Sequence, residues 1–210
     1  MNKRRSTLGA RISGRRSGQR FDADNRVTTE ALIFLGDLDP EAIGPSIEHA
    51  THYEPTPVGD FAPLLAHVPF ALERATFVDL GSGMGRGIFL AARYPFKTVV
   101  GVEFSRALHE VAKDNLARID PATLLCRDVR IICADAATYK FPRGPLVVYL
   151  YNPFDATVLT TILERLSTSA RPDLAIVYHT PIERAVIEAH PAFQLVAEEP
   201  SGAIYRRCKG

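Results

Sequence analysis

The sequence predicts an α/β fold: a doubly wound, mostly parallel seven-stranded sheet with an antiparallel C-terminal hairpin and a short N-terminal extension. Apolar runs rich in β-branched residues alternate along the chain with stretches whose apolar residues recur at helical spacing. The apolar runs are continuous, as in strands that helices cover on both faces. Right-handed crossovers between such strands build a doubly wound sheet.

Seven strands are expected, with helices between the first five. The five parallel strands should span Thr76–Leu80, Thr98–Glu103, Val129–Ala134, Leu146–Tyr151 and Leu174–His179. The helices should span Gly87–Ala92, Ser105–Leu116, Thr157–Leu166 and Pro181–Ala189, with N-caps at Ser105 and Asp155. The last two strands, Phe193–Glu199 and Ala203–Arg207, are separated only by Pro200-Ser201-Gly202, which indicates a hairpin.

Composition divides the chain into three parts. Residues 1–20 contain seven Lys and Arg, no acid and few apolar residues, so we expect a disordered basic tail. Residues 21–63 contain repeated proline turns and should form an irregular extension that packs on the main domain. Residues 64–210 should form the core domain.

The composition also excludes several classes of protein. With 210 residues and 46% hydrophobic content, the chain is large enough to bury a core. It contains neither an apolar run of about 18 residues nor a secretory signal, so we expect a cytoplasmic protein without a membrane partner. The three cysteines form no C-x-x-C pair, the histidines show no metal-ligand spacing, and Cys126 and Cys133 are expected in the core.

The residues that close the first two strands point to a nucleotide-type ligand. Asp79 begins a loop that is rich in glycine, which permits positive φ angles and close approach of the backbone to a ligand. Glu103 closes the second strand 22 residues after Gly81, where nucleotide-binding folds place a carboxylate on the ribose hydroxyls. The alternative interpretation is a tight turn that binds no ligand. It is disfavoured because a strand, a glycine loop, a helix, a second strand and an acid follow one another in the order of a nucleotide-binding fold.

The loop departs from the dinucleotide fingerprint. G-x-G-x-x-G would require glycine at position 86, where this chain has Arg86. Asp79 would repel a pyrophosphate and suits a cationic, amine-bearing ligand. A nucleotide-binding oxidoreductase is therefore the less favoured alternative.

Two motifs resemble those of the class I, Rossmann-like S-adenosylmethionine-dependent methyltransferases. Residues Phe77–Arg86 resemble the first motif of this family and Val100–Ser105 the second. Asp135-Ala136 resembles the position that contacts adenine, and the resemblance, which includes small bacterial members, runs from about Tyr53 to the C-terminus. It implies that the cofactor is S-adenosyl-L-methionine, held by Asp79, the backbone of Gly81, Ser82, Gly83 and Gly85, Glu103, Phe104, Asp135 and Ala136. Phe104 would stack on the adenine or belong to the core.

The resemblance also suggests residues on the acceptor side. Asn152 begins an Asn-Pro-Phe sequence like the motif of amino-methyltransferases that act on adenine or glutamine, but with one proline where those enzymes have two. It should contact cofactor and acceptor, or form a plain Asn-Pro turn. His179 is a candidate proton acceptor, with a structural hydrogen-bonding role as the alternative. Tyr53 and Thr56, in a Tyr-Glu-Pro-Thr-Pro sequence like the Pro-Thr-Pro stretches of some protein-lysine methyltransferases, should cover the cofactor or form a rigid proline turn.

We therefore expect a methyltransferase that acts on a nitrogen or oxygen acceptor, with a protein side chain ahead of a small molecule. A sulfonium is already an activated methyl donor, so alignment of the acceptor and exclusion of water are the main requirements. The basic tail suggests a second class of function, association with nucleic acid through phosphate contacts, against a merely solvated tail.

Overall fold

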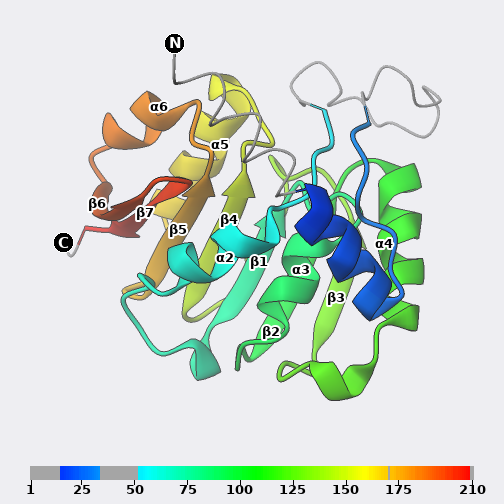
Figure 1. Ribbon diagram of the computed structural model, residues 1–210. Coiled ribbons are helices and arrows are strands. Elements are labelled where there is room, and N and C mark those ends of the chain that lie inside the picture. Colours follow the sequence, from blue (N-terminus) through cyan, green and yellow to red (C-terminus); the bar gives the residue numbers. More distant parts are fainter. Residues whose placement is uncertain (1–14, 34–51, 170, 209–210) are drawn as a thin grey trace, which may run out of the picture.

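One seven-stranded sheet organises the molecule, with the strand order β3-β2-β1-β4-β5-β7-β6 (Figure 1). The structure is a computed structural model and describes residues 15–33, 52–169 and 171–208. The pairs from β3 to β5 are parallel, and β7 runs antiparallel to both β5 and β6. This confirms the predicted fold class.

The strands agree with the predicted ranges to within one residue. They are β1 (Thr76–Leu80), β2 (Thr98–Glu103), β3 (Val129–Cys133), β4 (Leu146–Tyr151), β5 (Leu174–His179), β6 (Phe193–Glu199) and β7 (Gly202–Arg207). The helices are α2 (Val58–Leu65), α3 (Arg86–Ala91), α4 (Arg106–Arg118), α5 (Ala156–Ser167) and α6 (Arg184–Glu188), with short 3-10 turns at Leu72–Arg74 and Pro121–Thr123. Ser105 and Asp155 cap α4 and α5 as expected, each accepting a hydrogen bond from a backbone N–H of the first turn.

Helices cover the sheet on both faces. Phe77 of β1 packs with α2 and α3 in one apolar cluster, whereas Val78 packs with α5 in a second cluster on the opposite face. Alternate residues of one strand thus enter two cores, which is why β1, β2, β4 and β5 have continuous apolar sequences. None of the helices in the described ranges is long and apolar enough to cross a membrane.

The edge strand β3 departs from the prediction of full burial. All its residues are half-buried or exposed, since β3 lies at the edge of the sheet and pairs with β2. Cys133, expected in the core, is exposed there, so that prediction is wrong. Cys126 is buried as expected.

The N-terminal part of the described chain is more regular than predicted. Residues 15–25 form a helix, so the prediction of a disordered tail over residues 1–20 is wrong for 15–20, and residues 1–14 lie outside the described part. Phe21 anchors this helix because its buried ring lies beneath the guanidinium groups of Arg86 and Arg93, 5.6 and 5.1 Å from the ring centroid. The prediction of disorder rested on the charges of residues 1–20 and did not take into account that Phe21 would pack on the core.

Helix α2 was also not predicted. Pro57 was interpreted as part of a proline turn, but it is the N-cap of α2. Pro63, where the extension was expected to end, lies inside the helix. Phe61, Leu64 and Leu65 are buried and hold α2 on the core. The predicted boundary between residues 63 and 64 therefore falls within a helix.

Candidate functional site

A cleft lies at the carboxyl ends of β1, β2 and β4, where the strand order reverses. Ligands bind at such a switch point in open α/β sheets. The described lining comes from the glycine loop after β1, the start of α4, the end of β4 and the segment at residues 52–56: Asp79, Gly81, Ser82, Gly83, Arg86, Gly87, Glu103, Phe104, Leu108, Tyr151, Pro153, Phe154, His52, Tyr53, Glu54, Pro55 and Thr56.

Most of the residues that the sequence suggested for the cofactor meet in this cleft. Tyr53, Thr56, Asp79, Gly81, Ser82, Gly83, Glu103 and Phe104 line it. Gly85 instead caps α3 with a φ of 96°. Asp135, Ala136, Asn152 and His179 lie outside the described lining.

The glycine loop brings the backbone close to Tyr53. Gly81 and Gly83 have φ angles of 76° and 52°, which other residues rarely adopt. The backbone N–H groups of Gly81 and Ser82 both donate to the carbonyl of Val102, which fixes the loop to β2. A Cβ at Gly83 would lie 2.2 Å from a ring carbon of Tyr53, so only glycine lets this ring cover the loop.

Two carboxyl groups, Asp79 and Glu103, are buried in the cleft, 4% and 3% exposed. Burial raises the pKa of Asp79 to about 8, and the nearby Glu103 charge adds to this. Burial likewise raises the pKa of Glu103 to about 7, although its carboxylate accepts hydrogen bonds of 2.8 Å from the N–H groups of Ser105 and Gly83, which favour the charged form. A ligand that brings positive charge would stabilise both carboxylates.

Ser82 adds an unused polar atom to the same loop. Its Oγ is buried and, among the described residues, has no hydrogen-bond partner. A buried hydroxyl without a partner is unfavourable by about 1–3 kcal/mol. Together with the buried carboxyl groups, this hydroxyl suits a polar, cationic ligand.

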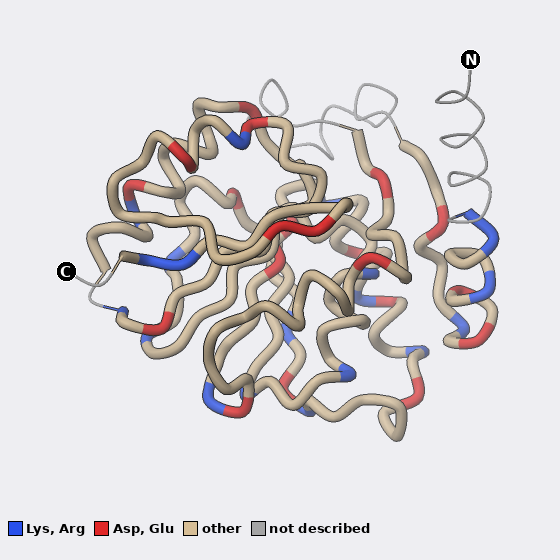
Figure 2. Tube along the Cα trace, turned by 60° about the vertical axis from the view of Figure 1, so that its left-hand side comes forward, with Lys and Arg blue, Asp and Glu red and all other residues tan. Residues whose placement is uncertain are grey.

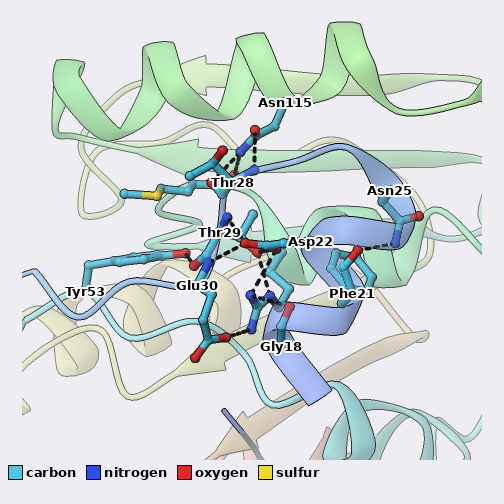
Figure 3. Close-up of polar contacts among 11 residues, drawn as sticks. Gly18, Phe21, Asp22, Asn25, Thr28, Thr29, Glu30, Tyr53 and Asn115 are labelled. Carbon is cyan, nitrogen blue, oxygen red and sulfur yellow. Dashed lines mark hydrogen bonds and ion pairs between the residues drawn. The ribbon is translucent and has the colours of Figure 1, made fainter. Parts of the chain in front are cut away.

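The guanidinium of Arg86 binds residues of the N-terminal segment, residues 15–33, several of which Figure 3 labels. Its guanidinium donates to Oε2 of Glu30 at 2.8 Å, to Oδ1 of Asp22 at 3.1 Å, to Oγ1 of Thr29 at 2.6 Å and to the carbonyl of Gly18 at 3.4 Å. Asp22 also accepts hydrogen bonds from the N–H groups of Thr29 and Glu30. We call these contacts of Arg86 with Gly18, Asp22, Thr29 and Glu30 the clamp. The sequence analysis used Arg86 to reject a dinucleotide site and did not predict these contacts.

The clamp continues to Tyr53 and to α4. The Asn115 amide bonds both the N–H and the carbonyl of Thr28 at 2.9 Å and also donates to the carbonyl of Met84 in the glycine loop. The Tyr53 hydroxyl donates to the carbonyl of Thr29 at 2.8 Å, and Tyr53 forms an antiparallel bridge with Ile33. The N-terminal segment thus holds Tyr53 close to the glycine loop.

His179 lies behind the cleft wall. It is 1% exposed, its Nδ1 is 2.9 Å from the Tyr149 hydroxyl, its Nε2 is 3.4 Å from Oδ2 of Asp60, and its ring stacks on Tyr151 at 4.4 Å. Burial lowers the pKa of His179 to about 4, against the opposing effect of Asp60, so the ring is neutral at pH 7. Tyr149 in turn lies 3.4 Å from Oγ1 of Thr56. His179 therefore contacts Tyr151 directly and Thr56 through Tyr149, and it does not itself line the cleft.

The end of β4 and the turn after it contribute residues to the cleft lining. Asn152 has a φ of 42°, a left-handed conformation that Asn tolerates better than most residues, and its Oδ1 accepts a hydrogen bond of 3.4 Å from the Tyr178 hydroxyl. Its neighbours Tyr151 and Pro153 both line the cleft. At the end of β3, a carboxylate oxygen of Asp135 accepts a hydrogen bond from the N–H of Ala137, and Ala136 is buried in an apolar cluster.

Comparisons with known proteins agree with this geometry. A family model described as a methyltransferase domain matches residues 78–172. A trans-aconitate 2-methyltransferase of Methylobacterium radiotolerans is 36% identical over 123 residues, which are 56% of this chain and 43% of that protein. The chain thus spans less than half the length of this relative.

Solved structures show the same fold at low identity. An RNA methyltransferase from Salinibacter ruber in complex with S-adenosyl-L-homocysteine has a TM-score of 0.54 at 23% identity, covering 72% of this chain and 91% of its own. A predicted N6-adenine-specific DNA methylase from Listeria monocytogenes has a TM-score of 0.57 at 13% identity, covering 74% and 52%. Residues 78–172 thus match a methyltransferase domain, and the fold of the chain is that of S-adenosylmethionine-dependent methyltransferases.

The cleft fits the cofactor of this class. Asp79 and Glu103 supply negative charge and hydrogen-bond acceptors for a ligand with an ammonium, a sulfonium and ribose hydroxyls. Ser82 offers its unused hydroxyl, and Phe104 an aromatic side chain in the same lining.

Replacing Arg86 tests the clamp. In Arg86→Met, the acids Asp22 and Glu30, 14% and 17% exposed, lose the cation that pairs with them. We expect the free energy of unfolding to fall by about 3 kcal/mol, because an unpaired buried charge is strongly destabilising, and S-adenosylmethionine to bind at least tenfold more weakly. Urea unfolding and calorimetry measure the two effects. The matched control Arg184→Met removes an exposed arginine paired with Glu188 and Glu198 and should change little; equal losses in both variants would contradict the clamp.

The buried carboxyl groups predict a pH dependence of stability. The folded pKa values of Asp79 and Glu103, about 8 and about 7, lie above the ordinary values of 3.8 and 4.5. The folded protein therefore binds more protons than the unfolded chain between about pH 4 and pH 8, so these groups stabilise the ligand-free fold at low pH and lose this effect as pH rises. We expect Asp79→Asn to reduce the fall in the free energy of unfolding between pH 5 and pH 8, measured in urea, whereas Asp173→Asn at an exposed position should not. If the free energy of unfolding depends on pH in Asp79→Asn as it does in the wild type, the raised pKa of Asp79 is contradicted.

Proposed function

We propose that the protein uses this cleft to transfer a methyl group from S-adenosylmethionine to a nitrogen or oxygen acceptor, with a protein side chain as the leading acceptor. The observation that carries the proposal is the burial of Asp79 and Glu103 beside an unpaired Ser82 hydroxyl on a glycine loop. Such a site favours a cationic ligand, and the sulfonium cofactor is one.

Each part of the cleft has a role in this proposal. Asp79 and the loop backbone hold the ammonium end of the cofactor, and Glu103 holds the ribose hydroxyls. Asp135 and Ala136 face the adenine from the end of β3. When bound, the cofactor supplies an electrophilic methyl group.

The remaining residues align the acceptor and exclude water. Tyr53 closes the cleft over Gly83, and the turn at Asn152 presents Tyr151 and Pro153 to it. His179 stacks on Tyr151 and fixes its ring. We propose Asn152 and His179 as positioning residues on this side of the site.

Transfer of a labelled methyl group tests the proposal. The full chain is incubated with S-adenosylmethionine labelled in the methyl group and a bacterial extract, which is then separated into protein, RNA and small molecules. We expect label in protein, stable to base if the acceptor is nitrogen and released as methanol if it is a carboxyl oxygen. Glu103→Ala serves as the non-binding control. Label that is equally abundant with wild type and Glu103→Ala would contradict the proposal.

A second candidate function is association with RNA through the N-terminal helix, residues 15–25. Arg15, Arg16 and Arg20 are exposed on this helix, and Figure 2 shows the positions of Lys and Arg along the chain in blue. The replacement of all three by Gln should make the log–log slope of RNA affinity against salt concentration shallower by roughly 2–3, since each lost phosphate contact lowers it by roughly 0.7–0.9. A slope that does not change would exclude this helix as the RNA contact.

A further inference from the structure

Part of the cleft lining is not used by the proposed cofactor contacts. It includes His52 and Glu54 from the segment at residues 52–56, and Tyr151 and Phe154 from the end of β4 and the turn after it. We call these four residues the acceptor end of the cleft. The Glu54 carboxylate is 3.6 Å from Nε2 of His52, and it is 53% exposed. This end therefore combines an accessible carboxylate with aromatic side chains.

Further negative charge lies next to this end. Asp60 at the start of α2 is 3.4 Å from His179, whose ring stacks on Tyr151, and the charge of Glu54 also acts on the His179 ring. The titratable groups around this end therefore include the carboxylates of Glu54 and Asp60, the imidazoles of His52 and His179, and the hydroxyls of Tyr149 and Tyr151.

The described lining of the cleft contains little positive charge. Arg86 is the one Lys or Arg in the described lining; it is 2% exposed and is paired with Asp22 and Glu30. In the sequence, the 47 positions from Val27 to Glu73 contain eight Asp and Glu and no Lys or Arg. A carboxylate or phosphate acceptor would meet repulsion here without a compensating cation.

We propose that the methyl acceptor is a primary amine, which Glu54 selects and which packs against Tyr151 and Phe154. This inference rests on the proposed function and specifies its acceptor. A carboxylate beside aromatic side chains attracts an ammonium through charge and through its contact with the rings. Glu54 is therefore the specificity-determining residue.

The proposed reaction balances with the groups present. The ammonium gives one proton to the Glu54 carboxylate, which is exposed enough to pass it to water. The lone pair of the free amine then attacks the methyl carbon, the carbon–sulfur bond breaks, and its electron pair stays on sulfur as a thioether. The product is a methylammonium, which carries the positive charge that the sulfonium has lost.

A panel of acceptors tests the inference. The full chain with labelled S-adenosylmethionine is given spermidine, a peptide with one lysine, trans-aconitate or RNA in separate reactions. We expect at least tenfold faster transfer to an amine than to trans-aconitate or RNA, and the first two arms distinguish a free amine from a lysine side chain. Glu54→Gln should lower kcat/KM for the amine at least tenfold and leave the Kd for S-adenosylmethionine within twofold, whereas Glu73→Gln, at an exposed position outside the cleft lining, should leave both unchanged.

Several results would overturn the inference. These are transfer to trans-aconitate or RNA but not to an amine, or an amine rate that Glu54→Gln leaves unchanged. Calorimetry keeps the test independent of turnover: the protein saturated with S-adenosylhomocysteine must bind spermidine or the lysine peptide, and no binding of either contradicts the inference. Failure to bind S-adenosylmethionine would instead contradict the proposed function.

Discussion

The burial of two carboxyl groups at one edge of the sheet is the constraint that organises this molecule. Asp79 ends in the cleft because it lies on β1 just before the glycine loop, and Glu103 because it closes the neighbouring strand β2. Both are almost fully buried, and burial without a cation disfavours their charged forms. The two N–H groups that donate to Glu103 offset part of this penalty, whereas Asp79 retains a pKa of about 8. The ligand-free fold therefore holds an unfavourable arrangement that a cationic ligand relieves.

The one arginine in the described cleft lining is paired with other acids. Arg86 follows the glycine loop, and its guanidinium is paired with Asp22 and Glu30. This leaves the carboxyl groups free for a ligand and fixes the N-terminal segment to the start of α3. Because the same segment bonds to Tyr53, which covers Gly83, the lid and the glycine loop are mechanically linked. A change in the N-terminal segment should therefore affect the cofactor cleft, although the two are far apart in sequence.

The sequence predicted the sheet well, because strands covered on both faces are continuously apolar and end at loops with clear turn chemistry. β3 and its Cys133 were misjudged because an apolar sequence does not reveal that a strand lies at the edge. The helix at residues 15–25 was missed because Asp22 contacts Arg86 from 64 positions away, and no local pattern reports such a pair. The positions of Asp79 on β1 and of Glu103 at the end of β2 were predictable from spacing. Asn152 and His179 were placed at the correct strand ends, but side-chain packing behind Tyr151 decides their orientation, and spacing alone cannot supply it.

Calorimetric titration with S-adenosylmethionine, with NAD in parallel, tests the central claim most directly. The wild-type protein should bind S-adenosylmethionine and not NAD, because the buried acids favour a cation and repel a pyrophosphate. Glu103→Ala, with an unchanged circular dichroism spectrum, should lose this binding. A folded wild-type protein that does not bind S-adenosylmethionine, or that binds NAD in its place, would contradict the account.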